Sequence, residues 1–162
     1  MPLKGSWILD APESVRIAFL QGLADGDGHA SVTNQEVGVA SICNQHLIGM
    51  LLQSLGVKSR PRNTGVLVRN KEAVLRLGSL PLFKHSTKRR ENLQELVNMM
   101  LARLKRRNYT KAEMKFIIRL HRKGMSYGKI AYELWKTHRI SRSPSALSNF
   151  VTREMQKKNS ES

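Results

Sequence analysis

Apolar residues follow two different periods between residues 12 and 104. Spacings of three and four residues predict helices over residues 12–24, 44–55, 71–80 and 91–105. Alternation of apolar and polar residues predicts strands over residues 29–33, 36–42, 57–62 and 66–69. The order is a helix, two strands, a helix, two strands and then helices, written α-β-β-α-β-β-α with the last two helices taken together, and it predicts an α+β fold with an antiparallel sheet. A loosely held arm, residues 1–11, precedes it, with Trp7 and Ile8 as its anchors.

The two expected strand pairs carry polar side chains on one face. Turn formers separate the strands in each pair, Asn34-Gln35 in the first and Asn63-Thr64-Gly65 in the second. In the first pair the polar face holds His29, Ser31 and Thr33; in the second it holds Lys58, Arg60 and Arg62. Cations at every second position of a short strand fit phosphate and guanine contacts. A solvated sheet face is the alternative.

Beyond residue 108 the pattern predicts helices alone. They are expected over residues 111–123, 127–138 and 145–157, with Thr110 and Ser126 as N-caps and Gly124 as a stop. We therefore expect two domains, residues 1–105 and residues 106–162. The second contains a basic linker at its start and a disordered tail over residues 156–162.

The charge of the chain points to a polyanionic partner. Lys and Arg outnumber Asp and Glu 28 to 12 in 162 residues, which gives a net charge of +16. Residues 103–162 carry 16 of these basic residues and only 4 of the acidic ones. Cys43 is the only cysteine, so neither an internal disulfide nor a cysteine zinc site is expected. With no signal peptide or membrane span evident, we expect a soluble intracellular protein, in the cytoplasm or nucleoid of a prokaryote, with no membrane partner.

One stretch near the N-terminus concentrates acidic residues at the predicted end of a helix. Asp25 and Asp27 alternate with Gly26 and Gly28. The negative end of a helix dipole disfavours carboxylates, and a hard divalent cation would relieve that conflict. Ordinary turn chemistry is the alternative, because Asp-Gly pairs are common turn formers.

The nine residues Leu20-Gln21-Gly22-Leu23-Ala24-Asp25-Gly26-Asp27-Gly28 resemble the signature of the LAGLIDADG homing endonucleases. Gln21 departs from it, since the family has a small residue there. The resemblance implies that Asp27 is the catalytic metal ligand, with the Gly26 carbonyl in support and Asp25 in a structural role. It also implies Mg²⁺ as the cofactor, with Mn²⁺ or Ca²⁺ as substitutes for binding. Because the chain has one motif, it implies a homodimer that pairs this helix with its copy through Ala18, Gln21, Gly22 and Asp25.

The same resemblance assigns further roles along residues 12–104. A polar residue that orders water follows the second strand, and Asn44 or Gln45 matches it. A lysine follows the second hairpin, and we expect Lys88, with Lys84 as the alternative. Simple phosphate contact is the competing role for both lysines. The sheet is expected to form a saddle over DNA, with these residues facing bases and phosphates: His29, Ser31, Thr33, Gln35, Lys58, Arg60, Arg62 and Arg69.

The C-terminal helices resemble a helix-turn-helix domain. The stretch from Gly124 to Leu134 matches the Gly-x-Ser…Ile-Ala…Leu pattern of such domains. In a helix-turn-helix domain of this kind, the third helix enters the major groove of DNA. A helical bundle that merely packs on the core is the alternative. Short hydrogen-bonding side chains and arginines on the third helix favour DNA binding, and the expected outward set is Arg142, Ser145, Ser148, Asn149, Thr152 and Arg153.

The leading hypothesis is a site-specific, Mg²⁺-dependent homing endonuclease, associated with an intron or intein, that cuts double-stranded DNA at a pseudo-palindromic site. One alternative is a non-catalytic transcription regulator with the same core and a helix-turn-helix. Another is an RNA maturase. The intact Asp27 favours the nuclease over the regulator, because a protein that only binds DNA gains nothing from a carboxylate beside phosphates.

Overall fold

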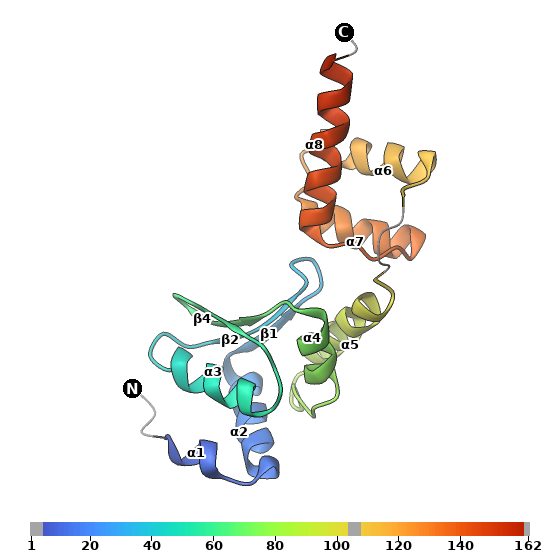
Figure 1. Cartoon of the computed structure of the whole chain (residues 1–162). Helices are drawn as coiled ribbons and strands as arrows, with labels where there is room; N and C mark the ends of the chain where they lie inside the picture. The colour runs from blue at the N-terminus through green and yellow to red at the C-terminus, as the bar shows by residue number, and fades with distance from the viewer. Residues whose placement is uncertain (1–4, 104–107, 161–162) are drawn as a thin grey trace. The chain divides into compact units, whose positions relative to one another are not determined.

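The computed structural model describes residues 5–103 and 108–160 and divides into two compact units, Met1–Met100 and Leu101–Ser162. The first unit contains the expected order of helices and strands, preceded by one extra helical turn (Figure 1). Its elements are α1 (Trp7–Asp10), α2 (Glu13–Asp27), β1 (Gly28–Ser31), β2 (Glu36–Ala40), α3 (Gln45–Ser54), β3 (Arg60–Arg62), β4 (Gly65–Val68), α4 (Lys71–Gly78) and α5 (Thr87–Leu101). Helix α1 replaces part of the loosely held arm, since Ile8 is fully buried while Trp7 stays exposed.

The four strands form one antiparallel sheet in the order β1-β2-β4-β3. One transverse row of this sheet contains His29, Gly38, Leu67 and Arg60, which share a face because partners across antiparallel strands point the same way. The next row, Ala30, Val37 and Val68, points to the opposite face and is buried. We call the face that carries His29 and Arg60 the outer face.

The core lies between the inner face of the sheet and the helices. Figure 1 shows α2 and α3 against the sheet, with α4 and α5 beside it. Leu20 and Ala24 of α2 and Leu51 of α3 are almost fully buried in this core. Burying a leucine side chain contributes about 1.5–3 kcal/mol. Helix α5 also contacts the edge strand, because Asn92 Nδ2 donates to the Ala30 carbonyl at 3.1 Å.

Two arginines close the C-terminal end of α3, whose last carbonyl groups lack partners within the helix. Arg16 Nη1 donates to the Ser54 carbonyl at 3.2 Å, and Arg76 Nε donates to the Leu55 carbonyl at 3.1 Å. The chain then turns at Gly56, with φ of +76°, the left-handed conformation that glycine adopts at little cost. Helix α3 therefore ends within one residue of the end of the helix expected over residues 44–55.

Helix α2 is longer than the sequence predicts. It continues to Asp27, so Asp25 and Gly26 are helical, and the expected end near Ala24 is wrong. The chain leaves the helix at Gly28 in an extended conformation, and its N–H donates to the Ala24 carbonyl. A Cβ at Gly28 would lie 2.4 Å from that carbonyl oxygen, so close backbone packing requires glycine. The motif therefore ends the helix at its last glycine.

The second unit is helical, with α6 (Lys111–Arg122), α7 (Tyr127–His138) and α8 (Pro144–Ser160). Thr110 and Glu113 form a capping box at the start of α6, and the Ser126 hydroxyl caps α7 by accepting from the Lys129 N–H. These three helices bury Ile117, Ile130, Ala131, Leu134 and Leu147 in a core of their own. Residues 156–160, where the sequence predicts a disordered tail, continue α8.

The expected domain boundary between residues 105 and 106 lies outside the described residues, as do residues 161 and 162 of the tail. Within the parts of the chain that the structure describes, no helix is both long enough and apolar enough to span a membrane.

Candidate functional site

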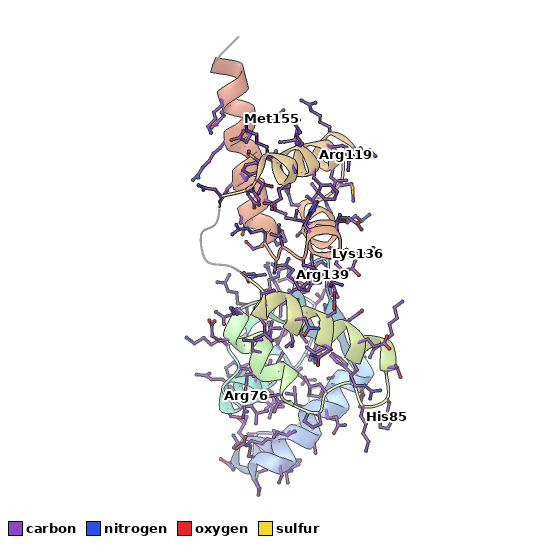
Figure 2. All side chains as sticks on the ribbon, turned by 90° about the vertical axis from the view of Figure 1, so that its right-hand side faces the viewer. Arg76, His85, Arg119, Lys136, Arg139 and Met155 are labelled. Carbon is purple, nitrogen blue, oxygen red and sulfur yellow. The ribbon has the colours of Figure 1, made fainter. Side chains whose placement is uncertain are left out.

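The C-terminal end of α2 presents one exposed carboxylate and one that is tied down. The Asp27 side chain is exposed. Asp25 is half-buried, and its Oδ1 accepts a hydrogen bond from the main-chain N–H of His85 at 3.2 Å. Figure 2 labels His85 on the loop that leads into α5. Asp25 therefore connects α2 to this loop, and Asp27 is left to face solvent.

Arg89, at the start of α5, caps the same end of α2. Its Nη1 donates to the Asp25 carbonyl at 2.8 Å and lies 3.4 Å from the carbonyl oxygens of Ala24 and Gly26. A cation in this position balances the partial negative charge of the helix end. The conflict between the helix dipole and the carboxylates is thus relieved in part by the protein itself.

Oxygen donors at this helix end are of the kind that Mg²⁺ prefers. They are the Asp27 carboxylate and the Gly26 carbonyl. Residues 5–103 and 108–160 contain no group of three or more His, Cys, Asp or Glu side chains that could hold a metal ion.

The other expected catalytic residues are dispersed around this end. Lys84 and Lys88 are exposed on either side of His85, in the loop and at the start of α5. Asn44 is the N-cap residue of α3, and the Gln45 amide donates to the carbonyl groups of Asn63 and Arg62 at 3.2 and 3.4 Å. Gln45 thus holds the β3–β4 turn. The structure brings the loop and α5 to the acidic end of α2, and it shows no direct contact between Asp27 and these four residues.

The outer face of the sheet exposes most of its expected DNA-contacting residues. His29, Lys58, Arg60, Arg62 and Arg69 are exposed. An open hollow of about 540 Å³ lies over β4 and the neighbouring strands, and His29, Arg62 and Arg69 are among the residues that line it.

Three expected members of this face differ from the rest. Gln35 is 3 % exposed, so the expectation that it faces DNA is wrong; its φ of +54° turns it inward at the β1–β2 turn. Ser31 and Thr33 are half-buried, with their hydroxyl oxygens 3.3 Å apart, and Ser31 Oγ also accepts from the Asn34 N–H. These hydroxyls stabilise the turn.

Two residues of this region, Arg89 and Glu36, were not predicted from the sequence. Helical spacing places Arg89 four residues before the buried Leu93 and seven before Leu96, and this signal would have directed its side chain inward. Glu36 is 6 % exposed, and its Oε2 accepts from Arg69 Nε at 2.7 Å. Finding this pair required knowing that β2 lies beside β4, which local pattern does not reveal.

The expected dimer contacts follow one side of α2. Ala18 and Gly22 are exposed, while Gln21 and Asp25 are half-buried. Val15, one turn before Ala18, is 41 % exposed. A Cβ at Gly22 would meet no atom within 4 Å, so packing within the described chain does not require glycine there.

In the C-terminal unit, α8 exposes four of the six expected residues, namely Ser145, Asn149, Thr152 and Arg153, while Ser148 is half-buried. Arg142 is 8 % exposed and lies over the Tyr109 ring, so the expectation that it points outward is wrong. Burial raises the pKa of the Tyr109 hydroxyl, and the neighbouring Arg142 cation opposes that rise. Figure 2 shows other cations of this unit at its surface, among them Arg119, Lys136 and Arg139.

Comparison with known proteins bears on the first unit. Residues 14–80 match the model of the LAGLIDADG-like domain, a segment that runs from the first turn of α2 past the end of α4. No curated protein and no solved structure matches the chain. The first unit of the chain therefore contains a LAGLIDADG-like domain.

Proposed function

We propose that this protein is a site-specific DNA endonuclease that acts as a homodimer and uses a divalent metal ion, Mg²⁺ in the first place. One observation carries the proposal. The end of α2 presents the exposed carboxylate of Asp27 on a framework fixed by Asp25 and Arg89. In a protein that only bound DNA, a carboxylate beside the phosphates would lower the affinity for DNA.

The residues present fit a metal ion as far as one chain can supply ligands. Asp27 and the Gly26 carbonyl would hold it, and Arg89 would compete with it for that carbonyl. When bound, such an ion polarises a phosphodiester and makes a water molecule more nucleophilic. Lys84 and Lys88 are exposed near this helix end, where their charge stabilises negative charge that develops on phosphate.

The single motif in each chain supports a dimer, because one chain supplies one Asp27 and cutting both strands of a duplex requires a second. A two-fold pairing of α2 with its copy would bring two Asp27 side chains together, one for each DNA strand, and would predict a pseudo-palindromic target. The exposed surfaces of Ala18 and Gly22 allow close approach of the two helices.

A substitution tests this pairing. Gly22→Leu should abolish the dimer while leaving the fold of each chain unchanged, because a Cβ there has open space. Light scattering measures the association state and circular dichroism the fold. Leu introduced instead at the exposed Ser79 after α4 is the control. A dimer that survives Gly22→Leu would contradict pairing through α2.

Two surfaces would contact DNA. The outer face of the sheet carries Arg60 and Arg62 on β3, with Lys58 before that strand and Arg69 directly after β4. Helix α8 carries Ser145, Asn149 and Arg153 on its exposed side, as a recognition helix of a helix-turn-helix would. The second surface would lie outside the central cut region.

The deciding experiment is a cleavage selection. The full chain is incubated with a library of duplex sequences in Mg²⁺ or in EDTA, and cut ends are sequenced, with Asp27→Asn run in parallel. We expect cuts at one related set of sites, only with Mg²⁺ and only with Asp27 intact. Sequence-specific binding without cutting would favour a transcription regulator. Binding restricted to RNA would favour a maturase.

A further inference from the structure

A buried carboxylate lies at the edge of the proposed DNA-binding face. Glu36 begins β2 and pairs across the sheet with Ser31, so it belongs to the outer face, yet only 6 % of it is exposed. Its Oε2 contacts Arg69 Nη2 and accepts from Arg69 Nε at 2.7 Å. Its Oε1 lies 3.7 Å from His29 Nε2 and 3.4 Å from Asn34 Nδ2. Both carboxylate oxygens therefore have partners.

An acidic residue here opposes general attraction to DNA. Removing a carboxylate from water costs several kcal/mol unless it is paired and hydrogen-bonded. The negative charge also cancels the positive charge of one arginine, so this pair adds little to phosphate attraction. A surface that needed only charge would be served better by Arg69 alone. The value of the Glu36–Arg69 pair for DNA binding therefore lies in its geometry rather than in its charge.

The effect of Glu36 on Arg69 is to fix it while leaving it accessible. Two nitrogen atoms of the guanidinium converge on one carboxylate oxygen, yet 53 % of the arginine side chain remains exposed. Arg69 also lines the hollow over the outer face, together with His29 and Arg62. An arginine held by a carboxylate has already lost rotamer freedom, so it loses less on binding a ligand.

We propose that Glu36 is a positioning residue that holds Arg69 as a base-reading arginine. Its target is the pair of acceptors on a guanine edge, O6 and N7, in the major groove. Arg60 and Arg62 are exposed and have no acidic partner among the described residues, so they act through phosphate contacts. This inference rests on the proposed function, in which the outer face binds duplex DNA.

The test is the base preference of the full-length protein, measured by selection from a randomised duplex library, together with the salt dependence of binding. Glu36→Gln should lower discrimination at one base pair in each half-site by about 10-fold. Affinity for random DNA should stay equal or rise, since one negative charge is removed. Arg69→Gln should lose the same preference at the same position.

Two controls separate positioning from charge. Glu72→Gln removes an exposed carboxylate on α4 and should change affinity in the same direction without altering base preference. Arg62→Gln should weaken binding to all duplexes alike and reduce the salt slope by about 1. If Glu36→Gln fails to fold, as judged by thermal unfolding, Arg69→Lys keeps the charge but removes the planar fork and should give the same loss of preference.

The outcomes distinguish this inference from the function on which it rests. A wild-type protein that binds no duplex would overturn both. A wild-type protein that selects one sequence, with Arg69→Gln and Glu36→Gln or Arg69→Lys selecting it equally well, would overturn the role of Glu36 and Arg69 alone. Loss of preference at many positions at once would mean that the pair only maintains the fold.

Discussion

In the N-terminal unit, Arg76 and Arg89 donate hydrogen bonds to main-chain carbonyl groups at the C-terminal ends of α3 and α2. In the C-terminal unit, Arg119 and Arg139 lie over the rings of Phe116 and Trp135 at 5.4 Å from the ring centroids. A hydrogen bond to a helix end offsets the charge of the arginine, since the helix end is partially negative. A ring contact leaves the positive charge in place.

The two units therefore use arginine for different purposes. In the first, arginines fix the ends of helices and, at Arg69, pair with a buried acid. In the second, most Lys and Arg side chains that the structure describes are exposed. Over residues 103–162, only 4 acidic residues accompany 16 basic ones. We expect the second unit to supply most of the general attraction to DNA. The first would supply chemistry and base discrimination.

The largest expected effect tests whether cleavage depends on the first unit. Asp27→Asn should reduce cleavage by at least about 10³-fold, because a metal ion contributes several kcal/mol to such a reaction. Affinity for DNA should be equal or higher, since a negative charge near phosphate is removed. Cleavage rates and gel-shift titrations measure the two effects. Glu72→Gln is the control, and a mutant that cuts at the wild-type rate would remove Asp27 from the mechanism.

Removal of residues 106–162 tests whether the second unit supplies the attraction. Affinity near 100 mM salt should fall by about 10- to 100-fold, and the slope of log affinity against log salt should become shallower. The cut position should not move, because Asp27 sets it. Circular dichroism checks that the remaining core is folded. An unchanged salt slope would show that the helical unit is a packing module.

Replacing one arginine in each unit compares the structural role of arginine in the first unit with its DNA-binding role in the second. Arg89→Met should lower the free energy of unfolding by about 1–2 kcal/mol, since three carbonyl groups lose a charged donor. Arg153→Met, at an exposed position of α8, should leave stability unchanged and reduce the salt slope by about 1. Urea unfolding and salt titration are applied to both variants. The reverse pattern would break the comparison.

The smallest expected effect concerns the fine specificity of α8. Ser145→Ala and Asn149→Ala should each cost about 1 kcal/mol of discrimination, and only at base pairs near the outer ends of the site. Selection from a library that is randomised at those ends measures it. Preference lost at the centre instead would place α8 near the cut site and contradict the division between the units.

The order of elements in the first unit was predictable because its signals are local. Alternating apolar residues, the turn formers and Gly56 set the strands and the end of α3. Thr110 and Ser126 likewise identified the starts of α6 and α7. The extension of α2 to Asp27 was not predictable from its glycines, because the Arg89 cap that stabilises this helix end comes from α5, more than sixty residues later.

The candidate site was predictable only in part. The motif predicted Asp27 as the catalytic residue; the structure places it exposed at the end of α2, and its role stays a prediction. Nothing local indicated that Glu36 and Arg69 would meet, since the pair joins the start of β2 to the end of β4. Gln35 was assigned to the DNA-facing side of the sheet by the family resemblance, and Arg142 to the outward side of the third helix, and both are buried. Polar residues at turns and helix starts are often used by the fold itself.

Gly22 and Gly26 have a consequence for how stability depends on concentration. Each lies inside α2, and a Cβ at either would meet no atom within 4 Å. Glycine in a helix interior is less favourable than alanine by about 1 kcal/mol. Helix α2 on its own is therefore weaker than an alanine-containing equivalent. If a second copy packs on this face, association compensates for that weakness, and the melting temperature rises with protein concentration. Dilution alone would then loosen the segment that carries Asp27.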